Sequence, residues 1–191
     1  MPLHLSTGST IETDQERRLA ELILYISRES AEDEGFGAVK LNKILYFSDF
    51  LAFGQYGSAI TGAEYQHLPQ GPAPRQLVPV RDKLVETKQL AIQERDVFGY
   101  TQKRTINLRE PNLDEFTGRQ IALVNWVIKT LLKGADATGA SLLSHAEVGW
   151  KTTANGETID YSTIFLSDAP LTAEETWRVL QIQRAPESMV A

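Results

Sequence analysis

The stretch VKLNKILYFSDFLAFGQYG, residues 39–57, decides the fold because its apolar residues would lie almost all the way around a helix. They are Leu41, Ile44, Leu45, Tyr46, Phe47, Phe50, Leu51 and Phe53. A surface helix carries one apolar stripe, whereas a helix that is apolar on every side is covered by several neighbours. We therefore expect residues 39–53 to form a central buried helix, which Gly54 and Gly57 weaken and end.

Helical patterns also flank this central segment. Thr13 and Glu16 have the spacing of a capping box, and an apolar stripe that begins at Leu19 predicts a helix over residues 14–29. A further helix follows residue 77, and Pro79 is expected to make its first turn irregular or to set its start. The remaining predicted helices run from the cap Asn112 to Gly134, over roughly residues 139–147, and through Trp177 and Leu180 near the end.

One segment reads as strands instead of helix. Residues 90–108, LAIQERDVFGYTQKRTINL, alternate loosely on both sides of a polar turn that contains glycine, which predicts a β-hairpin. We therefore expect an α+β, predominantly helical fold: five or six helices around the central helix, with a small β-hairpin or sheet. We expect residues 13–185 to be a single domain, between a lead-in at 1–12 and a tail at 186–191.

The composition narrows the classes of function. Nineteen Lys and Arg against 25 Asp and Glu give a net charge of −6, which argues against broad attraction to nucleic acid or to an anionic membrane and favours a basic partner. The absence of cysteine excludes disulfides, thiol catalysis and Cys-ligated zinc. No leader-like N-terminus or membrane-length apolar run is visible. We expect a cytoplasmic protein that makes no membrane contact.

Signatures of metal or phosphate chemistry are missing from the sequence. His4, His67 and His145 have no histidine partner at helical spacing, so nothing indicates a helical zinc site. Ser144 precedes His145 without the glycine-flanked elbow of a serine nucleophile. GSAITGA, residues 57–63, has alanine where a phosphate-binding loop requires lysine. We therefore expect no metal, no cofactor and no catalytic residues.

Two other functional classes remain open on the residues alone. A small hydrolase or transferase would use His145, Tyr46, Lys40 or Asp49 in a pocket. A winged-helix regulator of DNA would use basic residues of the central helix and the hairpin. These are Lys40, Lys43, Arg95, Lys103 and Arg104.

The segment EYQHLPQGPAPRQL, residues 64–77, is expected to form a rigid corner. Its three prolines each remove a backbone donor, which is the opposite of what phosphate binding by main-chain N–H groups needs. Gly71 is free to take positive φ, so we expect the corner to be a turn that fixes the direction of the extended segment relative to the helix that follows. Arg75, just after the corner, is our candidate for an exposed partner contact.

Three segments in this order resemble the Panacea or SocA-like antitoxin domain: VKLNKILYFSDF (39–50), YGSAITGAEYQHLPQGPAPRQL (56–77) and LLSHAEVGWKTT (142–153). The resemblance covers approximately residues 15–165. It implies a mostly helical domain with a small β component. It also implies the antitoxin of a bacterial or phage type II toxin–antitoxin pair, a non-enzymatic protein that neutralises its cognate toxin by direct binding. Occlusion of the toxin is the expected mechanism, and delivery of the toxin to a protease is the second.

The resemblance places family-motif residues in the central helix, the corner and the late S-H-x-x-x-x-W element. Together with Asp49 and Arg75, they form our set of candidate partner-binding residues. The set is Lys40, Lys43, Tyr46, Asp49, Tyr65, Gly71, Pro72, Arg75, His145 and Trp150. The sequence leaves open the identity of the toxin, which of these residues contact it, and the oligomeric state.

Overall fold

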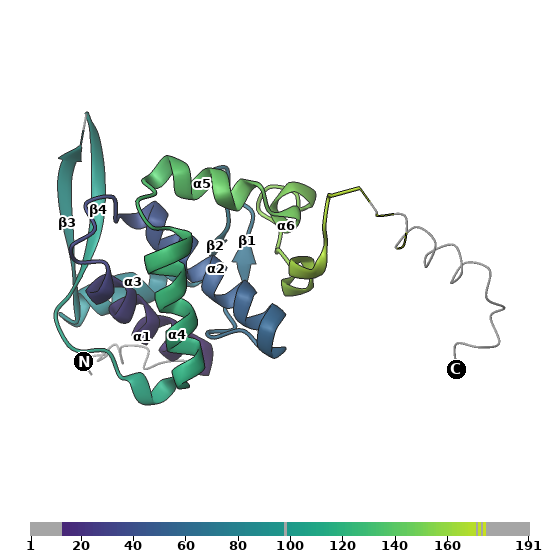
Figure 1. Ribbon diagram of the computed structural model, residues 1–191. Coiled ribbons are helices and arrows are strands. Elements are labelled where there is room, and N and C mark those ends of the chain that lie inside the picture. The colour runs from purple at the N-terminus through teal and green to yellow at the C-terminus, as the bar shows by residue number, and fades with distance from the viewer. Residues whose placement is uncertain (1–12, 98, 171, 173, 175–191) are drawn as a thin grey trace, which may run out of the picture.

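The computed structural model describes residues 13–97, 99–170, 172 and 174 (Figure 1). These residues contain six α-helices with two small antiparallel sheets, which confirms the α+β, predominantly helical fold. The helices are α1 (Asp14–Glu29), α2 (Ala38–Tyr56), α3 (Leu77–Glu86), α4 (Gly118–Trp126), α5 (Ala137–His145) and α6 (Val148–Thr152). Within the described part of the chain, no helix is both long and apolar enough to span a bilayer.

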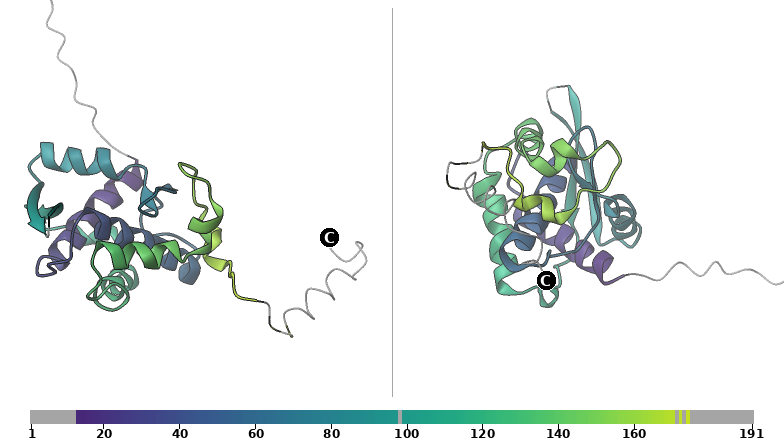
Figure 2. Two further views of the ribbon diagram at one scale, coloured as in Figure 1. Left: turned by 90° about the horizontal axis from the view of Figure 1, so that it is seen from above. Right: turned by 90° about the vertical axis from the view of Figure 1, so that its right-hand side faces the viewer.

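Each sheet has two strands. The predicted hairpin is confirmed as β3 (Leu90–Val97) paired with β4 (Tyr100–Asn107). The second sheet joins β1 (Tyr65–Gln66) to β2 (Ala73–Pro74) across the proline corner. The hairpin and α3 lie at one end of the molecule, and α6 lies at the other (Figures 1 and 2).

Helix α2 is the centre of the fold, as its apolar pattern predicts. It contacts α1, α4, α5, β2 and the 3-10 turn η3 (Tyr161–Phe165). Its side chains Leu41, Ile44, Leu45 and Phe50 are at most 1% exposed. The helix continues through Gly54 and ends at Gly57, which takes a left-handed φ of 73° and donates its N–H to Phe53 O.

Helix α1 has the predicted bounds and the predicted cap. The Thr13 hydroxyl accepts from the Glu16 N–H, and the Glu16 carboxylate accepts from the Thr13 N–H. Leu19, Leu22 and Ile23 are fully buried against the core. The capping box and the apolar stripe are both local signals, which is why the sequence predicts this helix correctly.

The predicted start of α4 is wrong. Asn112 caps only a 3-10 turn, η1 (Leu113–Glu115), by accepting from the Asp114 N–H. Phe116 is extended and interrupts the helix, and a second capping box between Thr117 and Gln120 then starts α4. After Trp126 the chain continues as a π-helical turn, η2 (Val127–Leu131).

Smaller differences lie at other helix ends. Helix α3 begins at Leu77, and Pro79 is its third residue, where no backward hydrogen bond is required. Helix α5 begins at Ala137, two residues before the predicted start, and α6 is not among the predicted helices. The predicted helix through Trp177 and Leu180 lies outside the described residues, as do the lead-in 1–12 and the tail 186–191.

Candidate functional site

Two lysines of the family motif lie at the start of α2 and are buried. Lys40 is 1% exposed, and its ammonium donates to Asp33 Oδ2 at 2.6 Å and to Ala135 O at 2.7 Å. A cation in the first turn of a helix opposes the helix dipole, and the Asp33 carboxylate offsets that effect. Lys40 therefore ties the loop before α2 to the segment before α5.

Lys43 reaches the corner instead. Its ammonium donates to Pro72 O at 3.3 Å, and burial lowers the pKa of Lys43 to about 8. Gly71 lies against it with φ +96°. A Cβ atom at Gly71 would lie 2.5 Å from Lys43 Nζ and 2.6 Å from Ser144 Oγ, so only glycine fits here without displacement of a neighbour.

The late S-H-x-x-x-x-W element packs onto the same corner. The His145 ring stacks on Trp150 with centroids 3.9 Å apart and an interplanar angle of 11°, and the His67 ring contacts Trp150 at 4.4 Å. The Trp150 indole donates to Leu68 O at 3.1 Å. Burial, and next the charge of Lys43, lower the pKa of His145. We call these residues and the Lys43 neighbourhood the corner cluster: Lys43, His67, Gly71, Pro72, Ser144, His145 and Trp150.

Asp49, further along α2, forms a separate internal network with Tyr65 of β1. The Asp49 carboxylate accepts from the Thr61 N–H at 2.7 Å, the Thr61 hydroxyl at 2.5 Å and the Tyr65 hydroxyl at 2.8 Å. Burial raises the pKa of Asp49. Tyr46 packs edge-on against Tyr65 with centroids 5.7 Å apart. All of these side chains are buried, so they hold the segment after α2 in place.

Arg75 is exposed, as expected, but its guanidinium contacts its own chain. It donates to Glu64 Oε1 at 2.8 Å, to Gln66 Oε1 at 3.1 Å and to Gly156 O at 2.7 Å. These contacts fasten the corner to the loop that follows α6. A partner that contacts Arg75 must therefore share its guanidinium with these internal acceptors.

The basic residues of the winged-helix alternative do not share a surface. Lys40, Lys43 and Arg104 are each at most 2% exposed, and Arg104 donates to the carbonyls of Asp33 and Ala31 at 2.8 Å. On the hairpin, Lys103 is exposed and pairs with Glu94 at 3.2 Å. Buried cations cannot contact phosphates, so of this set only Arg95 and Lys103, both on the hairpin, are exposed to a partner, and the predicted basic surface on the central helix is not formed.

The residues of the enzyme alternative are also divided. Lys40 is engaged with Asp33, Asp49 is enclosed by Thr61 and Tyr65, and His145 belongs to the corner cluster. A nucleophile and a base need to lie within hydrogen-bond reach of each other, and Lys40 and Asp49 bond to other groups. Among the described residues, no group of three or more His, Asp or Glu side chains is placed to hold a metal ion.

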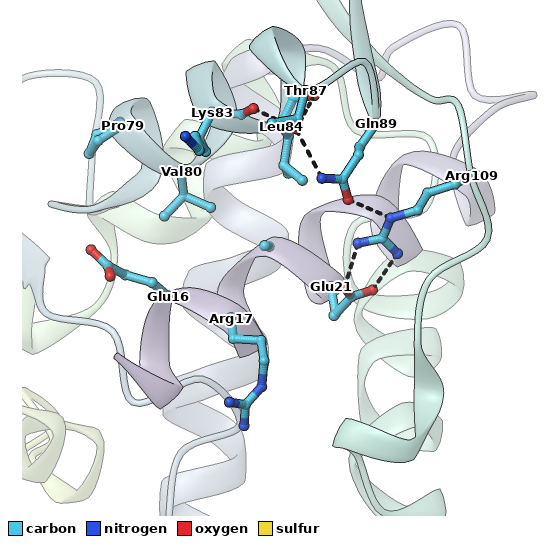
Figure 3. Close-up of a pocket in the computed structure, with 11 residues that line it drawn as sticks. Glu16, Arg17, Glu21, Pro79, Val80, Lys83, Leu84, Thr87, Gln89 and Arg109 are labelled. Carbon is cyan, nitrogen blue, oxygen red and sulfur yellow. Dashed lines mark hydrogen bonds and ion pairs between the residues drawn. The ribbon is translucent and has the colours of Figure 1, made fainter. Parts of the chain in front are cut away.

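A groove with a volume of about 380 Å³ lies elsewhere, between α1 and α3 (Figure 3). Its apolar lining comes from Ala20, Val80 and Leu84. Charged residues of both signs complete the lining: Arg17, Lys83, Arg109, Glu16 and Glu21. No pattern in the sequence predicts this α1–α3 groove. Its lining comes from distant segments, and no spacing within either helix indicates it.

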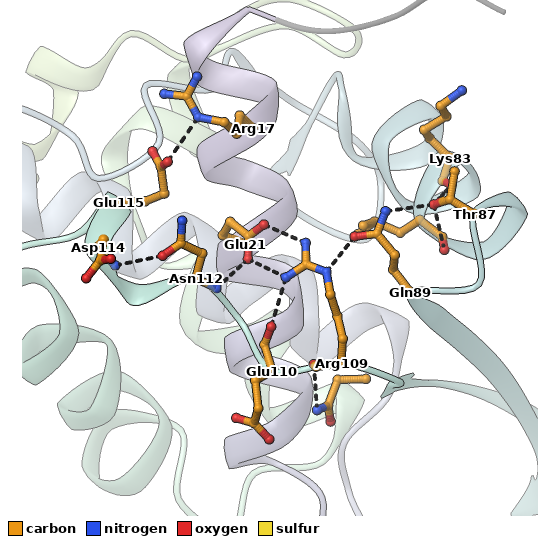
Figure 4. A network of polar contacts seen from close by, with 12 residues as sticks. Arg17, Glu21, Lys83, Thr87, Gln89, Arg109, Glu110, Asn112, Asp114 and Glu115 are labelled. Carbon is orange, nitrogen blue, oxygen red and sulfur yellow. Dashed lines mark hydrogen bonds and ion pairs between the residues drawn. The ribbon is translucent and has the colours of Figure 1, made fainter.

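A partly buried ion pair fixes one side of the α1–α3 groove (Figure 4). The Arg109 guanidinium donates to Glu21 Oε1 at 2.5 Å and Oε2 at 2.8 Å, and to Gln89 Oε1 at 2.5 Å. The Asn112 N–H donates to the same Glu21 carboxylate at 2.6 Å. The hydrogen bonds that Arg109 donates to the Glu21 carboxylate raise the pKa of Arg109. This network joins α1 to the segments on both sides of the hairpin.

Comparison with known proteins gives one match. The family described as "Antitoxin SocA-like, Panacea domain" matches residues 41–151, more than half of the chain. Searches of curated proteins and of solved structures found no significant match. The matched range runs from α2 through the corner to the Trp150 element, so it contains the whole corner cluster. The chain belongs to the SocA-like, Panacea-domain antitoxin family.

Proposed function

We propose that this protein is the antitoxin of a toxin–antitoxin pair and neutralises its cognate toxin in the cytoplasm by direct binding, through occlusion of the toxin's active surface. The observation that carries the proposal is the family match over residues 41–151. The net charge of −6 supports a basic toxin, because complementary fields accelerate association.

The burial of the motif residues bears on where the toxin binds. Lys40, Lys43, Tyr46, Asp49 and Tyr65 are each at most 1% exposed, so a partner that docks on the surface cannot reach them. Their contacts hold α2, the corner and α5 together. We propose that they build the scaffold and that other residues make the toxin contact.

The α1–α3 groove is the surface that best fits this role. Concave apolar surfaces with a charged rim are typical of sites that receive a partner's side chains. On the side of α3 away from the groove, Val78 (52%) and Val85 (38%) are exposed and share a second helical face. We propose that an apolar segment of the toxin occupies the groove.

Co-expression with the product of the adjacent gene tests the proposal. We expect that product to arrest growth when it is expressed alone, and growth to be restored when this protein is present. Normal growth with the neighbour alone, or arrest that persists with both proteins, would contradict the proposal.

Toxin abundance in the rescued cells separates the two mechanisms. Occlusion predicts that the toxin persists in full amount and co-purifies with this protein. Delivery to a protease predicts that the toxin disappears and that inactivation of the protease restores its abundance.

A further inference from the structure

We propose that the chain's own segment TWRVLQI, residues 176–182, docks on an exposed apolar surface formed by Phe53, Phe165 and Leu166. We call it the η3 surface, because it lies where η3 packs against the end of α2. Since η3 contacts α6, the η3 surface lies at the α6 end of the molecule, away from the hairpin and α3 (Figures 1 and 2). It is separate from the α1–α3 groove, and the proposal does not depend on the antitoxin function.

The side chains of the η3 surface are large, apolar and open to solvent. Phe165 is 66% exposed, and the next residue, Leu166, is 56% exposed. The Phe165 ring lies 6.1 Å from the ring of Phe53, which is only partly buried, so the three residues lie together at the end of α2. Single exposed apolar side chains are common, whereas neighbouring ones mark a surface that receives a partner.

The base of the η3 surface is already built by contacts within the fold. The Tyr161 ring stacks on Phe53 with centroids 5.4 Å apart, and the Tyr161 hydroxyl donates to Ala63 O at 2.7 Å. Ile164 packs closely against Gly54, since a Cβ atom at Gly54 would lie 3.4 Å from Ile164 Cγ1. A segment that docks on a preformed surface has only itself to order, which favours binding.

The chain leaves the fold beside the η3 surface. Asp168, two residues after Leu166, pairs with Lys151 of α6 at 2.5 Å. Trp177 is seven residues beyond Pro170, and this length of chain spans at most about 25 Å. A tether this short gives the segment an effective concentration on the order of millimolar at the surface. A second copy or a separate partner meets the surface only at its solution concentration, so the tethered segment is the favoured occupant.

The sequence of the segment suits an apolar surface. Trp177 and Leu180 are three residues apart, which places them on one face of the helix that the sequence predicts there. Aromatic side chains bury large apolar areas and prefer edge-on or offset contact with another ring, which Phe165 offers. Val179 points away from the face of Trp177 and Leu180 in such a helix, so it provides a control position.

A spin label on the full chain locates the segment, and the absence of cysteine allows one label to be attached at a chosen site. In Ala185→Cys the nitroxide lies just beyond the segment, and NMR measures how strongly it broadens each backbone amide signal of the isotope-labelled protein. We expect strong broadening at Phe165 and Leu166 and none at Val78 of α3. In a mixture of spin-labelled protein with separate isotope-labelled protein we expect no broadening. Broadening in the mixture would show docking between copies and would overturn the proposal.

Paired variants of the spin-labelled chain separate docking from the proximity that the tether alone imposes. Leu180→Ser removes an apolar side chain of the segment, and Phe165→Ser removes an exposed side chain of the surface. We expect each to abolish most of the broadening at Leu166. Val179→Ser, off the predicted face, and Leu142→Ser, at a 65% exposed position of α5, should leave that broadening unchanged. Undiminished broadening at Leu166 in Leu180→Ser or in Phe165→Ser would overturn the proposal.

Discussion

Replacement of Gly71 by alanine tests the packing of the corner cluster. Gly71 has a φ of +96°, and an alanine in left-handed backbone costs about 1–2 kcal/mol. The new Cβ would also lie 2.5 Å from Lys43 Nζ and 2.6 Å from Ser144 Oγ, both buried, and overpacking of this kind typically costs about 1–3 kcal/mol. We expect Gly71→Ala to lower the free energy of unfolding by about 2–5 kcal/mol.

Gly156 provides the matched control. It has a similar φ of +82°, but nothing lies within 4 Å of its would-be Cβ atom. Gly156→Ala therefore isolates the backbone term of about 1–2 kcal/mol. Urea denaturation of the wild type and both variants, followed by tryptophan fluorescence, gives the two losses. If Gly71→Ala destabilises the protein no more than Gly156→Ala does, the close packing of Lys43, Gly71 and Ser144 is refuted.

Three further predictions concern buried charges. Burial raises the pKa of Asp49 above 3.8, so the stability that this group contributes is full below its unfolded pKa and is lost as pH rises. The urea midpoint of the wild type should therefore fall relative to that of Asp49→Asn between about pH 4 and about pH 7. Burial lowers the pKa of Lys43 from 10.5 to about 8, so wild-type stability should increase with pH across that window, and Lys43→Met should lack this increase in denaturation curves recorded at each pH. Glu21→Gln should lower the free energy of unfolding by about 1–3 kcal/mol because it weakens the pairing of Arg109, and an unchanged urea midpoint would contradict the network.

The sequence predicts those elements of the fold whose signals are local. The capping box of Thr13 and Glu16 gives the start of α1, and its apolar stripe gives the buried face. The apolar pattern around residues 39–53 identifies α2 as the central helix. The start of α4 is harder because two caps compete. Asn112 and Thr117 both suit an N-cap, and the outcome depends on Phe116, which is extended and lies under the guanidinium of Arg18 at 5.1 Å.

The candidate residues illustrate the same limit. Their spacing in the sequence cannot show that Lys40 and Lys43 are buried, because a lysine near a helix start is usually solvated. Only the tertiary contacts of these lysines with Asp33 and Pro72 show the burial. The stacking of His145 on Trp150 crosses the break between α5 and α6, so no helical spacing predicts it. The α1–α3 groove depends on the packing of whole helices, which the sequence pattern does not resolve.

The most direct test of the central claim is to fill the α1–α3 groove and measure toxin binding. Ala20 is half-buried in its lining, so Ala20→Phe places a ring inside the groove, and Ala122→Phe makes the same change at an exposed position of α4. The account predicts that calorimetry with the purified toxin shows binding by Ala20→Phe at least about tenfold weaker than by the wild type, a loss of about 1.4 kcal/mol, with rescue of growth lost. Ala122→Phe should bind like the wild type. Wild-type affinity and full rescue by a folded Ala20→Phe variant would contradict the claim that the toxin occupies this groove.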